Sequence, residues 1–141
     1  MKEQIIQIPD NFEIKEIKDN KIILVEKEKK LTYKDVIKGL YPHSHEKVMA
    51  GYFNSEKHLQ KLIAINKLMN VAKYLNGDWQ PNWSNDDNKY YIIMNGNGLL
   101  WIHCDTFYNS AIVYFKSIEL AKQAIEILGE ETIKLALCTD Y

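Results

Sequence analysis

The fold is decided by residues 55–77, which have the sequence SEKHLQKLIAINKLMNVAKYLNG. Ser55 is suited to cap a helix, and Gly77 stands where a helix commonly ends in a left-handed residue. Between them, apolar residues recur at spacings of three and four, which predicts a helix with one buried face. The predicted face consists of Leu62, Ile65, Leu68, Met69, Ala72 and Leu75. We therefore expect a long central helix that supports the other elements.

The chain before this helix predicts a hairpin and a short helix. Residues 4–8 form a strand candidate that Pro9 stops, and residues 21–26 form a second, apolar and β-branched candidate after a turn at Asp19-Asn20. Thr32 and Asp35 have capping-box spacing, so a helix is expected from about residue 33 to 38, with Gly39 and Pro42 stopping it. These elements predict an antiparallel hairpin followed by one short helix.

The chain after the central helix predicts a meander and two helices. The strands are expected at 89–94, 99–104 and 110–116, with a hairpin turn at Asn95-Gly96-Asn97-Gly98. Ser117 should cap a helix that runs to Leu128, and a last helix follows Gly129. Clustered strands favour the α+β class: an antiparallel sheet with the long central helix and the C-terminal helices packed on one face.

The length favours one domain. The chain has 141 residues, which is enough for a self-sufficient core. We expect a single domain over 1–141, with the hairpin and short helix in 1–54 and the long helix, three-strand meander and last helices in 55–141.

The charged residues argue against one class of partner. All eighteen basic residues are lysine, and the net charge is −1. Arginine is the usual reader of guanine edges and phosphates, so its absence argues against sequence-specific nucleic-acid recognition. Residues 1–70 hold thirteen lysines against ten acidic residues, whereas residues 71–141 hold five against nine. The second half is therefore mildly acidic.

The remaining composition predicts a cytoplasmic protein with no membrane association. The apolar runs are far shorter than the ~20 residues of a membrane span, and the N-terminus lacks the pattern of a signal peptide. Cys104 and Cys138 are too few for a disulfide scaffold, and a reducing compartment would keep them as thiols.

Two groups of residues carry part of the pattern of a metal site. His43 and His45 form an HxH pair with His58 nearby, but a zinc site needs further ligands that the neighbourhood does not supply cleanly. Asp86-Asp87 lacks the glycine and the distal glutamate of a calcium loop. We expect no metal and no cofactor.

His103, Cys104 and Asp105 follow one another like a compressed thiol triad. His103 and Cys104 are neighbours on a predicted strand, so their side chains point to opposite faces and cannot form a nucleophile–base pair. We expect no catalytic residues and no enzymatic activity.

The loop after the central helix is the candidate site. It carries Trp79 and Trp83 among Asp78, Asp86 and Asp87. Indoles in a loop either plug the end of the domain or anchor a partner, and acidic neighbours would steer a basic one. These five residues are the predicted partner-binding site, with the plug as the alternative for each tryptophan. Trp101, on a predicted strand, is expected to be structural.

Three segments resemble a family of small proteins carried by phages and mobile elements of gut bacteria. They are the opening Ile-Gln-Ile-Pro-Asp-Asn-Phe-Glu-Ile (6–14), the Tyr-Leu-Asn-Gly-Asp-Trp-Gln-Pro-Asn-Trp turn (74–83) and the closing segment 113–129. One group of similar size and opening looks like type II-A anti-CRISPR proteins, which inhibit the CRISPR nuclease. The resemblance does not cover 27–55 and defines no functional residues.

The resemblance implies a non-enzymatic phage accessory protein that binds a host protein, such as a CRISPR nuclease, and inhibits it. Two alternatives remain open. One is a binder of a small molecule or nucleotide, acting as a sponge for a defence signal. The other is a structural or uncharacterised phage protein. The oligomeric state does not follow from the sequence.

Overall fold

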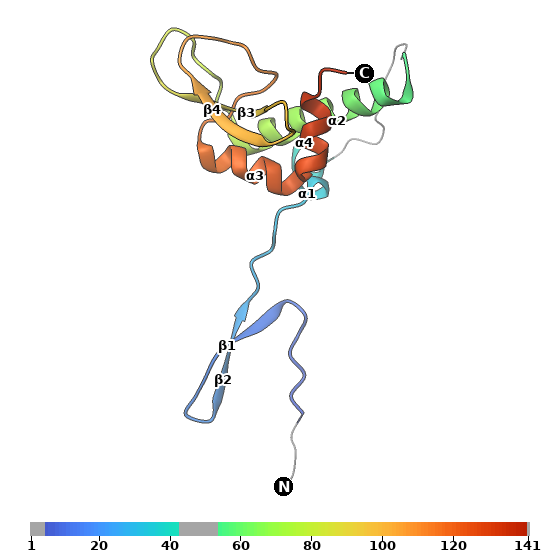
Figure 1. Cartoon of the computed structure of the whole chain (residues 1–141). Coiled ribbons are helices and arrows are strands. Elements are labelled where there is room, and N and C mark those ends of the chain that lie inside the picture. Colours follow the sequence, from blue (N-terminus) through green and yellow to red (C-terminus); the bar gives the residue numbers. More distant parts are fainter. Residues whose placement is uncertain (1–4, 43–53, 141) are drawn as a thin grey trace. The chain divides into compact units, whose positions relative to one another are not determined.

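The computed structural model describes residues 5–42 and 54–140 and confirms the α+β class. The chain divides into two compact units, Met1–Lys30 and Leu31–Tyr141, which we call the N-terminal unit and the main unit (Figure 1). Each unit contains one two-stranded antiparallel sheet, and the four helices found among the described residues belong to the main unit. The strands predicted to share one sheet therefore form two separate sheets.

The N-terminal unit is a hairpin of β1 (Phe12–Lys18) and β2 (Lys21–Glu26). The turn lies at Asp19 and Asn20, as predicted, and both residues have positive φ, 48° and 59°. This conformation matches the twist of the flanking strands. The strand predicted at 4–8 is wrong over its described part, because residues 5–8 have no regular structure and the first strand begins only after Pro9.

The short helix α1 (Tyr33–Leu40) begins as predicted. Thr32 Oγ1 accepts from the Asp35 N–H, and the Asp35 carboxylate accepts from the Thr32 N–H, which completes the capping box. The helix does not stop at Gly39, however. Gly39 lies under the Tyr74 ring, so its missing side chain lets the two helices approach.

The long helix α2 (Glu56–Asn76) has the predicted Ser55 cap and ends at Gly77, where φ is 59°. Its buried residues are Ala64, Leu68, Val71 and Ala72. The buried face is thus rotated from the predicted one, and Met69 is 51% exposed. The rotation arises because α2 contacts α1, α3 and α4, so small residues at several positions face neighbours.

The main unit's sheet has two strands, β3 (Lys89–Met94) and β4 (Leu100–Asp105). The predicted third strand, 110–116, is wrong: it contributes only a bridge, in which Tyr90 and Phe115 exchange backbone hydrogen bonds of 3.0 and 2.7 Å. The buried Tyr114 hydroxyl explains the difference. It accepts from the Ser110 and Ala111 N–H groups and donates to the Tyr108 carbonyl, which holds this segment as a loop.

Two C-terminal helices complete the core, as predicted: α3 (Ile118–Leu128), capped by Ser117, and α4 (Glu130–Leu137). Gly129, with φ of 81°, separates them. They bury Ala121, Ala124, Ile133 and Ala136 with α2 and with the inner face of the sheet.

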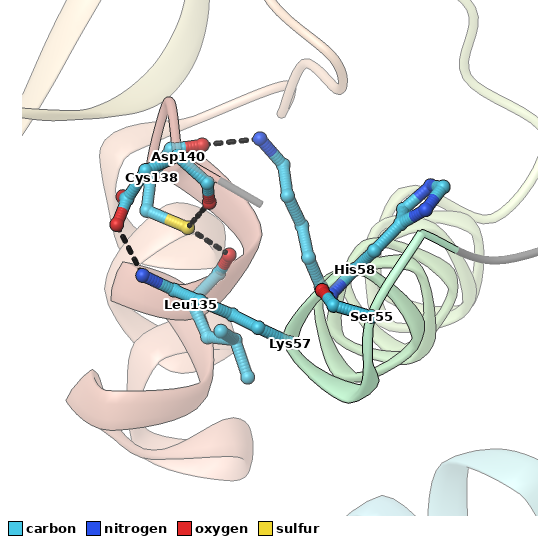
Figure 2. Close-up of polar contacts among 7 residues, drawn as sticks. Ser55, Lys57, His58, Leu135, Cys138 and Asp140 are labelled. Carbon is cyan, nitrogen blue, oxygen red and sulfur yellow. Dashed lines mark hydrogen bonds and ion pairs between the residues drawn. The ribbon is translucent and has the colours of Figure 1, made fainter.

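The end of the chain is fastened to the first turns of α2. Figure 2 shows Lys57 beside Asp140, to whose carboxylate it donates. Lys61 donates to the Cys138 carbonyl. The Lys57 hydrogen bond lowers the pKa of Asp140, and the Asp140 carboxylate raises the pKa of Lys57. Both cysteines are free thiols, and the Cys138 thiol donates to the Leu135 carbonyl.

Across residues 5–42 and 54–140, no helix combines the length and the apolar character needed to cross a membrane.

We predict that Gly39→Ala destabilises the main unit by about 1–3 kcal/mol, because overpacking a filled contact costs that much. The new Cβ would lie 2.5 Å from Tyr74 Cε2. Urea unfolding measures the change. Gly96→Ala is the matched control, because a Cβ there meets no atom within 4 Å. Equal effects of the two substitutions would contradict the close approach.

Candidate protein-binding surface

The loop between α2 and β3 is tied down at its start by Asn76. The Asn76 side chain donates to the Tyr114 carbonyl at 2.8 Å and accepts from the Lys116 N–H at 3.0 Å. Lys73 donates to the Gly77 carbonyl, and the Trp79 N–H donates to the Asn76 carbonyl. The loop therefore leaves the helix in a defined direction.

The far end of the loop is held by a buried lysine. Lys89 is 1% exposed and is the only charged residue that is buried in the described part of the chain. Its ammonium donates to the Asn85 carbonyl (3.1 Å), to Asn85 Oδ1 (2.9 Å) and to the Thr106 carbonyl (2.8 Å). All three ammonium protons are thus used on neutral oxygens, which a buried charge requires. Lys89 connects the tryptophan loop with the loop after β4.

Trp83 packs into this arrangement. Its ring meets Tyr114 edge-on with 4.7 Å between centroids, and Lys89 Nζ lies 5.5 Å from its centroid, within the range of a cation–π contact. The row continues from Tyr114 to Tyr91 (5.3 Å) and from Tyr91 to His103 (5.6 Å). Trp83 is half-buried and begins an aromatic row that runs onto the sheet.

The outer face of the sheet carries this row. The pairs Lys89↔Asp105, Tyr91↔His103 and Ile93↔Trp101 lie opposite each other in the register and share the face turned away from the core. Burial raises the pKa of the Tyr91 phenol, and its hydrogen bond to the Asp105 carboxylate raises it further.

Exposure increases along this face towards the hairpin turn. Trp101 is 57% exposed and its partner Ile93 is 38% exposed, so the expectation that Trp101 is structural is wrong. In strand β4 the inward positions are taken by Leu100, Ile102 and Cys104, which leaves the indole outside. Exposed tryptophan beside isoleucine is typical of binding surfaces.

A groove lies next to this exposed pair and runs along the edge of β3. It has a volume of about 240 Å³ and is lined by Tyr91, Ile92, Ile93, Met94, Ser110, Ala111, Ile112 and Leu137. Ile112 is 46% exposed. Trp101, Ile93, Ile112 and this groove together are called the apolar surface below.

The groove also contains an open strand edge. The Tyr90 N–H donates to the Phe115 carbonyl, and the Tyr90 carbonyl accepts from the Phe115 N–H. The Asn95 N–H donates to the Leu99 carbonyl. Because antiparallel pairing alternates, the backbone groups of Ile92 and Met94 point away from β4 and towards the groove. In the described part of the main unit, the Tyr90–Phe115 bonds are the only backbone bonds that close this edge.

The predicted site residues are only partly brought together. Trp79 is half-buried and, with Asp87, lines a polar hollow of about 300 Å³ whose other residues are Gln80, Asn82, Asn85, Asn88, Lys89 and Lys116. It also lines a second hollow, of about 160 Å³, between α2 and the 113–114 segment. Asp78 and Asp86 are exposed and line none of these hollows. A binding role for these five residues stays a prediction.

The candidate chemical groups lie apart. His103 and Cys104 point to opposite faces of β4, as their alternation requires. His58 Nδ1 accepts from the Asn54 N–H, and His43 and His45 lie outside the described residues. Within the described ranges, no three or more His, Cys, Asp or Glu side chains come together as a metal site would need.

The sequence contained a weak signal for the anchoring role of Lys89, which was not predicted. Strand residues 89–94 alternate, so Lys89 shares a face with Tyr91 and Ile93. A lysine at the head of such a face could have been marked as a loop anchor. Strand β4 carries a signal too, because its alternation places Trp101 on the face of His103 and Asp105, opposite the apolar Leu100, Ile102 and Cys104.

Comparison of the chain with protein-family models, with curated proteins and with solved structures gave no match.

We predict that Lys89→Met destabilises the main unit by about 2–4 kcal/mol, because it leaves buried carbonyls without donors. The same substitution should loosen the loop and raise the acrylamide quenching of Trp83 fluorescence. Urea unfolding and quenching measure both effects.

Lys122→Met is the matched control, since Lys122 is exposed on α3 and should change neither quantity. A Lys89→Met protein with unchanged stability would show that the ammonium does not hold the loop.

Proposed function

We propose that this chain is a non-enzymatic protein that acts by binding another protein through the apolar surface. The observation that carries the proposal is the coincidence of an open β3 edge with an apolar groove and the exposed Trp101–Ile93 pair. Such an edge accepts an extended segment as an additional strand, and the groove holds its alternate side chains.

The surroundings define the segment that would fit. The lining is mainly aliphatic, so the bound residues should be apolar at alternate positions. Residues 71–141 carry five lysines against nine acidic residues, which favours a partner with basic residues around that segment. Trp101, beside the groove, would serve as the anchor at one end.

A host defence protein is the partner we propose, with a CRISPR nuclease first. The support is the resemblance of residues 6–14, 74–83 and 113–129 to phage and mobile-element proteins, one group of which looks like type II-A anti-CRISPR proteins. The chain would then act in the cytoplasm of a bacterial host.

We expect purified protein to inhibit DNA cleavage by a type II-A nuclease, and Ile93→Ser to weaken inhibition and binding at least about tenfold, as for an interface anchor. Ile118→Ser on α3 is the matched control, because Ile118 and Ile93 are both 38% exposed. Cleavage titrations and biolayer interferometry provide the readouts, with circular dichroism as the folding check.

Full inhibition by Ile93→Ser would remove the apolar surface from the proposal. No inhibition by the unmodified protein would remove the nuclease as partner. In that case, a photo-crosslinker placed at position 112, with position 118 as its control, tests protein binding in host cells.

The polar hollow beside Trp79 favours a second candidate, a binder of small polar molecules. Its volume of about 300 Å³ lies at the lower end of ligand pockets. Trp79 offers a stacking face, and Gln80, Asn82, Asn88 and Lys116 offer hydrogen-bonding groups. A nucleotide-sized signal would suit this lining only if its charge avoided Asp87.

For this candidate, native mass spectrometry of the freshly purified protein should detect a bound small molecule. Trp79→Ala should abolish that adduct, whereas Trp101→Ala, at an exposed indole that does not line the hollow, should retain it. A clean spectrum for the unmodified protein, together with no thermal shift on addition of nucleotides, would exclude the candidate.

A further inference from the structure

Trp79 differs from Trp83 in what covers its ring. Trp83 meets Tyr114 edge-on and lies beside the Lys89 ammonium, whereas within the described residues no aromatic ring or cation packs on Trp79. The Trp79 ring lines two hollows and is half-buried, so part of it is open to solvent. Its backbone is fixed, because the Trp79 N–H donates to the Asn76 carbonyl at 3.1 Å. The loop therefore presents an apolar ring in a defined position with space beside it.

The polar hollow of about 300 Å³ beside Trp79 is lined mainly by amide side chains. Four of its eight lining residues are Asn or Gln, namely Gln80, Asn82, Asn85 and Asn88. A side-chain amide both donates and accepts hydrogen bonds. Across residues 5–42 and 54–140, the side chains of Gln80, Asn88 and Lys116 have no hydrogen-bond partner. These three groups are available to a ligand.

The other amides of the hollow keep the loop in shape. Asn82 Oδ1 accepts from the Ser84 N–H at 2.9 Å, and Asn85 Oδ1 accepts from the Asp87 N–H at 3.2 Å. Asn85 Nδ2 also donates to the Asp87 carboxylate at 2.9 Å. Such Asx turns, together with the Lys89 anchor, fix this wall before a ligand arrives. A wall that is already ordered loses less entropy on binding.

The lining suits an uncharged ligand better than a phosphate. Phosphate sites in proteins use arginine, lysine or the N–H groups of a helix N-terminus. The chain has no arginine, and all three ammonium protons of Lys89 are used on neutral oxygens. Of the charged lining residues, Lys116 alone has protons to donate, and the Asp87 carboxylate would repel an anion.

We propose that the polar hollow binds an uncharged sugar ring, which stacks on Trp79 and bonds through its hydroxyls to the surrounding amides. A pyranose has a face of C–H groups and a rim of hydroxyls. The negative face of an indole attracts the C–H face, and each hydroxyl both donates and accepts, as an amide does. The proposal rests on the second candidate function above in placing a ligand in this hollow, and it assigns a ligand without phosphate.

Saturation-transfer NMR on the full chain tests the ligand class. The probes are the methyl glycosides of glucose, galactose, mannose and N-acetylglucosamine, with adenosine mono- and diphosphate as anionic comparators. We expect at least one glycoside to bind with a dissociation constant on the order of 1 mM, as a small ligand in a small hollow implies. If no glycoside binds, the proposal is overturned. Nucleotide binding in that case would still support the second candidate function, so the two failures are distinguishable.

A glycan array distinguishes a free sugar from a sugar residue of a glycan. The labelled full chain is applied to the array, with the glycoside that binds in solution as competitor. Retention that the competitor abolishes assigns the site to a glycan residue. Binding in solution without retention on the array assigns it to a free sugar.

Two tryptophan variants place the ligand in the hollow. Trp79→Ala should weaken glycoside binding at least about tenfold through loss of the stacking face. Trp101→Ala is the matched control, because Trp101 is 57% exposed and does not line the hollow. Circular dichroism checks the fold of both variants. Equal binding by the two variants would overturn the stacking role of Trp79.

A second pair of variants leaves the ring in place. Asn88→Leu removes one amide from the hollow without breaking a hydrogen bond of the fold, and it should weaken glycoside binding several-fold. Asn97→Leu, at an exposed position in the turn between β3 and β4, is the matched control and should bind as the unmodified protein does. Unchanged binding by Asn88→Leu would overturn the hollow as the sugar site, even if Trp79→Ala fails to fold.

Discussion

The main unit depends on the three hydrogen bonds of the Lys89 ammonium. A charge that is 1% exposed is tolerable only when every proton has an acceptor, and the acceptors here belong to two different loops. Bringing Asn85 and Thr106 to one atom closes the end of the sheet and places Trp83 over the cation. The aromatic row through Tyr114 and Tyr91 then follows from that placement.

The Lys89 anchor also distinguishes the two tryptophans of the loop, because one supports the fold and the other keeps surface for a ligand. Trp83 is engaged by Tyr114 and Lys89, so it serves the fold. Trp79, in contrast, borders two hollows and retains surface for a ligand. Trp101, which shares the outer face of β4 with His103 and Asp105, is the indole best placed to touch another protein. A fixed loop beside an open strand edge combines rigidity with access, which limits the entropy lost on binding.

Local chemistry made much of the fold predictable. The caps at Thr32, Ser55 and Ser117 and the Asp19-Asn20 turn depend on neighbours within a few residues, and each formed where expected. Features that depend on distant partners were not predictable. Met69 faces outward because α2 packs against three other helices, which rotates its buried face. The third strand is absent because the Tyr114 hydroxyl bonds to the backbone of its own loop. For the candidate site, the sequence predicted the tryptophan loop, but it predicted neither Lys89 as the anchor of that loop nor the open edge of β3.

The register of the N-terminal hairpin has a consequence for how it tolerates change. Ile14 and Ile17 of β1 lie opposite Leu24 and Ile22 and share a face, because Lys15 is an extra residue, a β-bulge, between Ile14 and Glu16. Deletion of Lys15 would give a regular strand in which Ile14 and Ile17 still share that face, whereas a residue added opposite Lys15 in β2 would remove the bulge and turn Ile17 to the other side. Homologous chains should therefore tolerate the loss of the bulged residue better than a residue added opposite it.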